Sequence, residues 1–147
     1  MTEAIRQGDI PGVQLRCRQA LPLAAAEAWP WITEPASLEG WLADRVVPFA
    51  EDGFETETEF EGEPIKERAV ELESQAPDRR VLAFRRLDAG WEADTRLTLE
   101  LFPAAHGSEL SVLQQGFEQL SLSTCLTVWE AYRRRWRQAL ARLAAAT

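Results

Sequence analysis

Apolar and polar residues alternate in several stretches of the chain. In segment 13–19, Val13, Leu15 and Cys17 occupy every second position, which is the period of a strand with one buried face. Five further stretches show the same period and are separated by glycine and proline turns: 54–60, 66–73, 80–87, 91–101 and 109–115. The pattern therefore predicts strands joined by hairpins.

One parity of each strand is expected to face the core. In 66–73 we place Val70 and Leu72 inward, with Arg68 on the same side, and in 80–87 we place Arg86 on the side of Phe84. An arginine on an apolar face either extends its charged end to water at the edge of the sheet or meets an anion. Arg68 and Arg86 are therefore candidate ligand-binding residues.

The last two predicted strands have the clearest alternation. Their inward positions include Trp91, Leu97, Leu99, Val112 and Gln114. A shift of register by one residue would exchange inward and outward positions.

Two short helices are predicted between the first strand and the rest of the sheet, one that begins at 24–29 and contains Pro30, and one over 33–42. Pro30 removes an internal hydrogen bond and is expected to bend or shorten the last turn of the first helix. Thr33 or Ser37 is a candidate N-cap of the second helix.

Residues 119–145 are predicted to form one long C-terminal helix. Leu126, Trp129, Arg133 and Trp136 recur there at spacings of three and four, so they are expected to share one helix face. The apolar faces of helix and sheet must be buried against each other. The predicted fold is α+β, with a curved antiparallel sheet wrapped around the C-terminal helix, in one domain over 1–147.

Several segments, taken in order, resemble a known family: W-x-W-I-T-E-P-x-S-L-x-x-W-L, RRVLAFR, T-R-L-T-L-E-L-x-P, GSELSVLQQGF and a helix carrying W-x-x-x-L-x-x-L. This series is similar to the heat-shock ATPase-activator-like (AHSA-like) branch of the START/SRPBCC helix-grip superfamily, from about residue 12 to residue 143. Two positions depart from the family pattern. Gln114 stands where the branch often has a histidine, and the sequence WPW replaces an ordinary helical run.

The resemblance implies a helix-grip fold with a cavity between the sheet and the long helix. Many members of the branch are inferred to bind small hydrophobic molecules, eukaryotic relatives stimulate a chaperone ATPase, and distant relatives are cyclases or aromatases. Our first hypothesis is therefore the binding of a small hydrophobic or amphipathic ligand. The alternatives are a protein-interaction module of the chaperone-regulator type and, less favoured, a cyclase-like or aromatase-like enzyme.

The candidate ligand-binding residues come from the inward positions and from the predicted helix face. They are Trp41, Arg68, Phe84, Arg86, Trp91, Leu97, Leu99, Val112, Gln114, Leu126, Trp129 and Arg133. Core packing is the competing interpretation of the tryptophans, because aromatic side chains usually bury most of their surface. We assign Trp29 to the core and Trp41 to the edge of the cavity, and leave Trp31 open.

Charge and composition narrow the function further. Sixteen basic and twenty-four acidic residues give a net charge of −8, which disfavours binding to nucleic acid. The chain has no apolar run long enough to span a membrane and no signal-peptide pattern, so we expect no membrane partner and a cytoplasmic location. The ten acidic residues of 51–73 and the basic C-terminal helix allow a homodimer as a further hypothesis.

Catalytic and metal-binding motifs are not found in the sequence. The single histidine, His106, lies in a predicted turn, and Cys17 and Cys125 lack the spacing of a zinc site or a disulfide framework. We expect no catalytic residues, no metal and no cofactor. If catalysis occurs, Tyr132 or an arginine is the group to test.

Overall fold

The structure, a computed structural model, describes residues 13–147, with the side chains of all of these except 122–124. The elements are β1 (Gln14–Leu21), α1 (Ala25–Thr33), α2 (Pro35–Leu38), β2 (Arg45–Phe49), β3 (Gly53–Phe60), β4 (Glu63–Gln75), β5 (Arg79–Arg86), β6 (Thr95–Ala104), β7 (Gly107–Gln115), the short 3-10 helix η2 (Phe117–Gln119) and α3 (Leu122–Ala146).

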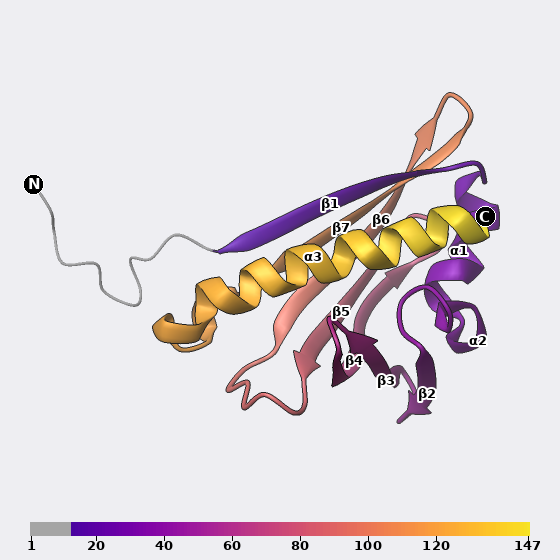
Figure 1. Ribbon diagram of the computed structural model, residues 1–147. Helices are drawn as coiled ribbons and strands as arrows, with labels where there is room; N and C mark the ends of the chain where they lie inside the picture. The colour runs from indigo at the N-terminus through magenta and orange to yellow at the C-terminus, as the bar shows by residue number, and fades with distance from the viewer. Residues whose placement is uncertain (1–12) are drawn as a thin grey trace, which may run out of the picture.

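The strands form one antiparallel sheet in the order β1-β7-β6-β5-β4-β3-β2. The helix α3 runs across one face of this curved sheet, and α1 and α2 lie near the C-terminal end of α3 (Figure 1). The predicted α+β helix-grip architecture is confirmed. Because consecutive strands from β2 to β7 are neighbours, β1 is brought to the edge of the sheet beside the last strand.

The core lies between the sheet and α3. Trp136 and Leu143 of α3 pack there with Phe84 of β5 and Leu110 of β7, and each of these side chains is less than 2% exposed. The alternation predicted for 91–101 and 109–115 is confirmed from Thr95 onward, because the inward positions are buried. Residues 91–94 instead belong to the connection between β5 and β6.

The position of β1 is fixed partly by the hairpin between β6 and β7. Gly107 has φ +141°, and a Cβ at this position would overlap the carbonyl oxygen of Leu21. Ser108 also donates its hydroxyl hydrogen to the carbonyl of Leu23 at 2.7 Å. The close approach explains why a glycine stands at this turn.

The inward assignment for 66–73 is wrong. Glu67 and Ala69 face the core with exposures of 1% and 0%, whereas Arg68 and Val70 are only half-buried and Leu72 is 59% exposed, on the opposite face. The hydrophobic pattern fails here because a glutamate occupies a core position, where it is paired with polar groups of α3.

The chain also forms a strand that the pattern did not predict. β2 has five residues, and Val46 is its one fully buried side chain. Its hydrophobic signal is weak because Pro48 and the exposed Val47 interrupt it. A proline is tolerated because β2 is at the edge of the sheet.

The first helix continues beyond Pro30, contrary to the expected shortening, and ends at Thr33. Two side chains hold its last carbonyl groups. Trp41 donates its indole N–H to the carbonyl of Trp31 at 3.0 Å, and Arg80 donates to that of Ile32 at 2.9 Å. These two carbonyls belong to the last turn, where a helix leaves its carbonyl groups without partners inside the helix. The second helix is shorter than predicted and spans a single turn.

The predicted inward face of α3 is also wrong at Leu126, which is 66% exposed. Trp136 is buried as predicted, but the buried face carries Cys125 and Tyr132 beside it, and Leu126, one position after Cys125, falls on the solvent side. The spacing rule could not separate these neighbours, because either one fits a three-four repeat.

Candidate functional site

A groove of about 500 Å³ runs between β1 and α3. Its walls are Gln14, Leu15, Arg16, Cys17, Arg18 and Gln19 of β1 and Trp129, Arg133, Arg137 and Leu140 of α3. The helix residues follow one another at spacings of three and four, so they lie on one helix face. The residues of β1 are consecutive and belong to both faces of the strand, so the groove follows the edge of the sheet. The volume is in the usual range for small-molecule sites.

Four arginines surround this groove in a protein whose net charge is negative. Arg16 donates to the hydroxyl of Ser111 at 3.2 Å, and Arg18 lies 3.8 Å from a carboxylate oxygen of Glu109 at the surface. Both pairs connect β1 to β7 and leave other guanidinium hydrogens without a described partner, since each guanidinium has five donors.

The two arginines of α3 are less fully paired than those of β1. Arg133 lies 4.0 Å from Glu130 and places its guanidinium over the Trp129 ring, 5.6 Å from the centroid. Its Nε is buried and has no hydrogen-bond partner. For Arg137, no ion pair is found within residues 13–147. The groove therefore presents positive charge beside the apolar side chains of Leu15 and Leu140.

Cys17 lies half-buried in the wall of the same groove. Burial raises the pKa of its thiol, while the positive charges of Arg137 and Arg133 act in the opposite direction. The thiol is therefore mostly protonated at neutral pH and is a poor nucleophile. It is well placed as a chemical reporter of occupancy.

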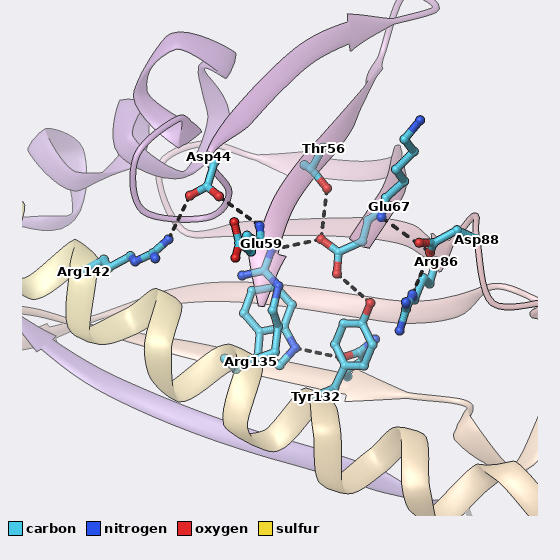
Figure 2. Close-up of polar contacts among 12 residues, drawn as sticks. Asp44, Thr56, Glu59, Glu67, Arg86, Asp88, Tyr132, Arg135 and Arg142 are labelled. Carbon is cyan, nitrogen blue, oxygen red and sulfur yellow. Dashed lines mark hydrogen bonds and ion pairs between the residues drawn. The ribbon is translucent and has the colours of Figure 1, made fainter. Parts of the chain in front are cut away.

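The interior beneath α3 contains a buried polar cluster centred on Glu67 (Figure 2). Its carboxylate accepts hydrogen bonds from Tyr132 at 2.6 Å, from Arg135 at 2.9 Å and from Thr56 at 2.9 Å. The side chains of Arg135 and Glu67 are 3% and 1% exposed. Burial and the adjacent Glu67 carboxylate raise the pKa of the Tyr132 phenol well above its usual range. The cluster connects α3 to β3 and β4 inside the core.

Tyr132 is consequently poorly suited to proton transfer. Its hydroxyl is committed to Glu67, and its ring is packed against Trp91 and Phe84 with centroid distances of 5.4 Å and 5.8 Å. It does not line the groove. This arrangement supports a structural role for Tyr132, which the sequence offered for catalysis as an alternative to an arginine.

A second buried chain of hydrogen bonds links α3 to the centre of the sheet. Trp136 donates its indole N–H to the side-chain oxygen of Gln114 at 2.7 Å, and Gln114 donates to the hydroxyl of Thr95 at 2.9 Å. Thr95 in turn donates to the carbonyl of Phe84 at 2.8 Å. Gln114 therefore has partners for both ends of its amide and is not aimed at an empty space.

The candidate ligand-binding residues separate into three groups. Trp129 and Arg133 line the groove. The buried group, packed in the core cluster, comprises Trp41, Phe84, Trp91, Leu97, Leu99, Val112 and Gln114. The remaining residues lie elsewhere: Leu126 points to solvent, Arg68 pairs with Glu55 on the opposite face of the sheet, and Arg86 pairs with Asp88 at 2.7 Å near the end of β5.

Most of the candidate residues lie in the core, and only two of them line the groove. Leu15, Cys17, Arg137 and Leu140 were not proposed as site residues. The spacing of Trp129, Arg133 and Arg137 along α3 could have suggested a shared face. The pairing of that face with the edge strand β1 depends on the sheet order, which the sequence pattern does not contain.

No group of three or more histidine, cysteine, aspartate or glutamate side chains suited to a metal ion occurs in the part of the chain that the structure describes. Over the same residues, no helix is both long enough and apolar enough to cross a membrane.

The fold and groove define an α+β helix-grip domain of the ligand-binding or regulatory type. The model of the family described as "Activator of Hsp90 ATPase homolog 1-like protein" matches residues 22–146. The chain belongs to this family, as its resemblance implied. A search among curated protein sequences gives no significant match.

Solved structures show the same fold at low sequence identity. Protein CV1439 from Chromobacterium violaceum is 22% identical with a TM-score of 0.68, over 90% of this chain and 95% of its own. Protein Ms6760 from Mycobacterium smegmatis is 11% identical with a TM-score of 0.73, over 92% and 89%. The AHSA1 protein from Silicibacter pomeroyi is 17% identical with a TM-score of 0.69, over 91% and 96%.

Proposed function

We propose that the protein binds a small amphipathic anion, such as a hydrophobic carboxylate, in the groove between β1 and α3. The observation that carries the proposal is that Arg133 and Arg137 line one groove together with the half-buried ring of Trp129. The side chain of Arg133 is 40% exposed and Arg137 is exposed, so both guanidinium groups can donate charged hydrogen bonds to a bound anion. The apolar part of the ligand would lie mainly against the half-buried ring of Trp129, above the core residues Leu15 and Leu140.

This proposal keeps the ligand class expected from the sequence and moves the site outward. The sequence placed the ligand deep between the sheet and α3, among side chains that are buried in the core. The groove lies between the same two elements but at the edge of the sheet, where ligand entry does not require α3 to move.

The alternative of a protein-interaction module based on the acidic strands has weaker support. Arg68 donates to Glu55 at 2.8 Å, and Lys66 lies 3.8 Å from Glu57, so part of the acidic face is neutralised by neighbouring strands. The proposed function is non-catalytic binding, because the groove combines positive charge with apolar surface and its thiol is a poor nucleophile.

Replacing the two helix arginines is expected to weaken binding of a hydrophobic carboxylate. With dodecanoate as the probe, Arg133→Gln is expected to raise the dissociation constant about tenfold, since a charged hydrogen bond contributes about 1.5 kcal/mol. Arg133→Gln with Arg137→Gln is expected to raise it further. Isothermal titration calorimetry measures both effects.

The matched control is Arg134→Gln, which removes the neighbouring guanidinium. Arg134 pairs at 2.9 Å with Glu61, in the turn between β3 and β4, and does not line the groove. The dissociation constant of the Arg134→Gln variant for dodecanoate should equal that of the wild type. Equal affinities of the wild type and the double variant would refute the proposed site.

A further inference from the structure

We infer that the free edge of β1 is a docking site for an extended acidic peptide, which would add as an eighth strand to the sheet. β1 is the outermost strand beside β7, and α3 runs alongside it (Figure 1). The inference extends beyond the binding of a small anion, because it depends on main-chain hydrogen bonds that such a ligand does not need.

The direction of the backbone groups in β1 follows from the hydrogen-bond pattern. In an antiparallel strand, the N–H and C=O groups of one residue point to the same side, and successive residues alternate. The carbonyl of Gln14 accepts a hydrogen bond from the Trp129 indole at 2.8 Å, so the backbone N–H and C=O groups of Gln14 point away from β7. The backbone groups of Arg16, Arg18 and Ala20 therefore also point to the free edge.

The ends of this edge are occupied, and its middle is open. Trp129 covers the carbonyl of Gln14, and the side-chain amide of Gln19 donates to the carbonyl of Ala20 at 3.0 Å. Between them, the backbone N–H and C=O groups of Arg16 and Arg18 form no hydrogen bond with any residue in the described range. An open edge of this kind is the template for adding a strand.

The charges around the edge select an acidic partner. An added strand lies about 4.8 Å from β1, and its side chains alternate between the two faces of the sheet. One set would face Arg16 and Arg18, and the other would face the groove floor formed by Leu15 and Leu140, with Arg133 at its rim. A peptide in which acidic and apolar residues alternate satisfies both faces.

A second copy of this chain is a poorer occupant. Antiparallel pairing of two β1 strands would bring the arginines of one copy close to those of the other. Like charges in cross-strand positions are destabilising. The same arginines that attract an acidic peptide therefore oppose pairing of the protein with itself through this edge.

The test uses a fluorescently labelled ten-residue peptide of alternating glutamate and valine, with binding followed by fluorescence anisotropy. In a second peptide the backbone nitrogens of all glutamates are N-methylated, and in a third peptide those of all valines are. Because a strand presents alternate N–H groups to its neighbour, one methylated peptide is expected to bind at least tenfold more weakly and the other to retain its affinity. Equal affinities of all three peptides, or no binding, would overturn the inference.

The variant Arg18→Pro tests the edge from the side of the protein. Proline removes the N–H that faces the edge and leaves the bonds to β7, since edge strands tolerate proline at such positions. Compared with Arg18→Ala, which removes the same charge, Arg18→Pro should weaken peptide binding about tenfold. An unchanged circular dichroism spectrum confirms folding, and equal peptide affinity of the two variants would contradict the inference.

The same variants distinguish a failure of this inference from a failure of the small-anion proposal. Arg18→Pro keeps Arg133 and Arg137, so its affinity for dodecanoate should equal that of Arg18→Ala even if the peptide does not bind. Sedimentation velocity tests whether a second copy of this chain occupies the edge. A wild-type dimer that becomes a monomer on the Arg18→Pro substitution would assign the edge to a second copy and overturn the peptide inference.

Discussion

Replacing Glu67 by methionine is expected to lower the free energy of unfolding by about 3–5 kcal/mol, because it leaves the buried Arg135 without a counter-charge. Arg135 is 3% exposed, and its Nε already lacks a partner. The substitution also removes the acceptor of the Tyr132 and Thr56 hydroxyl groups. Urea denaturation of the wild type and the variant measures the difference.

Two further variants isolate the effect of the buried charge. Glu61→Met removes the partner of Arg134, the neighbour of Arg135, but this pair is about half exposed and its loss should cost less than about 1 kcal/mol. In the double variant Glu67→Met with Arg135→Met, the uncompensated charge is gone, so part of the stability should return. A double variant less stable than Glu67→Met alone would show that the charge is not the cause.

The second large effect is expected at Trp136. Its side chain is 1% exposed, packs 6.1 Å from the Phe84 ring and donates to Gln114. Trp136→Ala is expected to cost about 3–5 kcal/mol, because it opens a cavity in the core and leaves the Gln114 oxygen unpaired. For a protein of this size, the loss corresponds to a fall of roughly 10–16 °C in Tm. Differential scanning calorimetry measures the shift.

The comparison with Trp136→Phe divides this cost into packing and hydrogen bonding. Phenylalanine retains most of the ring contacts but cannot donate to Gln114, so a loss of about 1–3 kcal/mol is expected. Trp129→Ala is the control on the same helix, because Trp129 lies half-buried at the groove and not within the core. A Trp129→Ala loss as large as that of Trp136→Ala would contradict the assigned core and groove faces of α3.

The architecture could be predicted from the sequence because period-two and period-three-four patterns distinguish strands from the long helix. The pattern located β6 and β7 well, since their inward residues are apolar apart from Thr95, Ser108 and Gln114. It failed for β4, where Glu67 occupies a core position that its partners on α3 make favourable. Such a pair is invisible in the local pattern, because Glu67 and Arg135 are far apart in the sequence.

The groove was only partly predictable for a related reason. Arg133 and Trp129 were identified from the helix periodicity, but their neighbour in space is the first strand of the sheet. Residues of β1 such as Cys17 had no local feature of a binding site. Their role depends on β1 pairing with β7 beside α3, which brings together the two ends of the described chain.

The most direct test of the central claim, that the groove between β1 and α3 binds an amphipathic anion, is the alkylation rate of Cys17 in the presence of dodecanoate. Cys17 lines the groove, whereas Cys125 is 4% exposed in the core and serves as the internal reference. We predict that saturating dodecanoate slows labelling of Cys17 by iodoacetamide at least fivefold and leaves Cys125 unchanged, while dodecanol at the same concentration has little effect. Equal labelling rates of Cys17 with and without bound dodecanoate would contradict the claim.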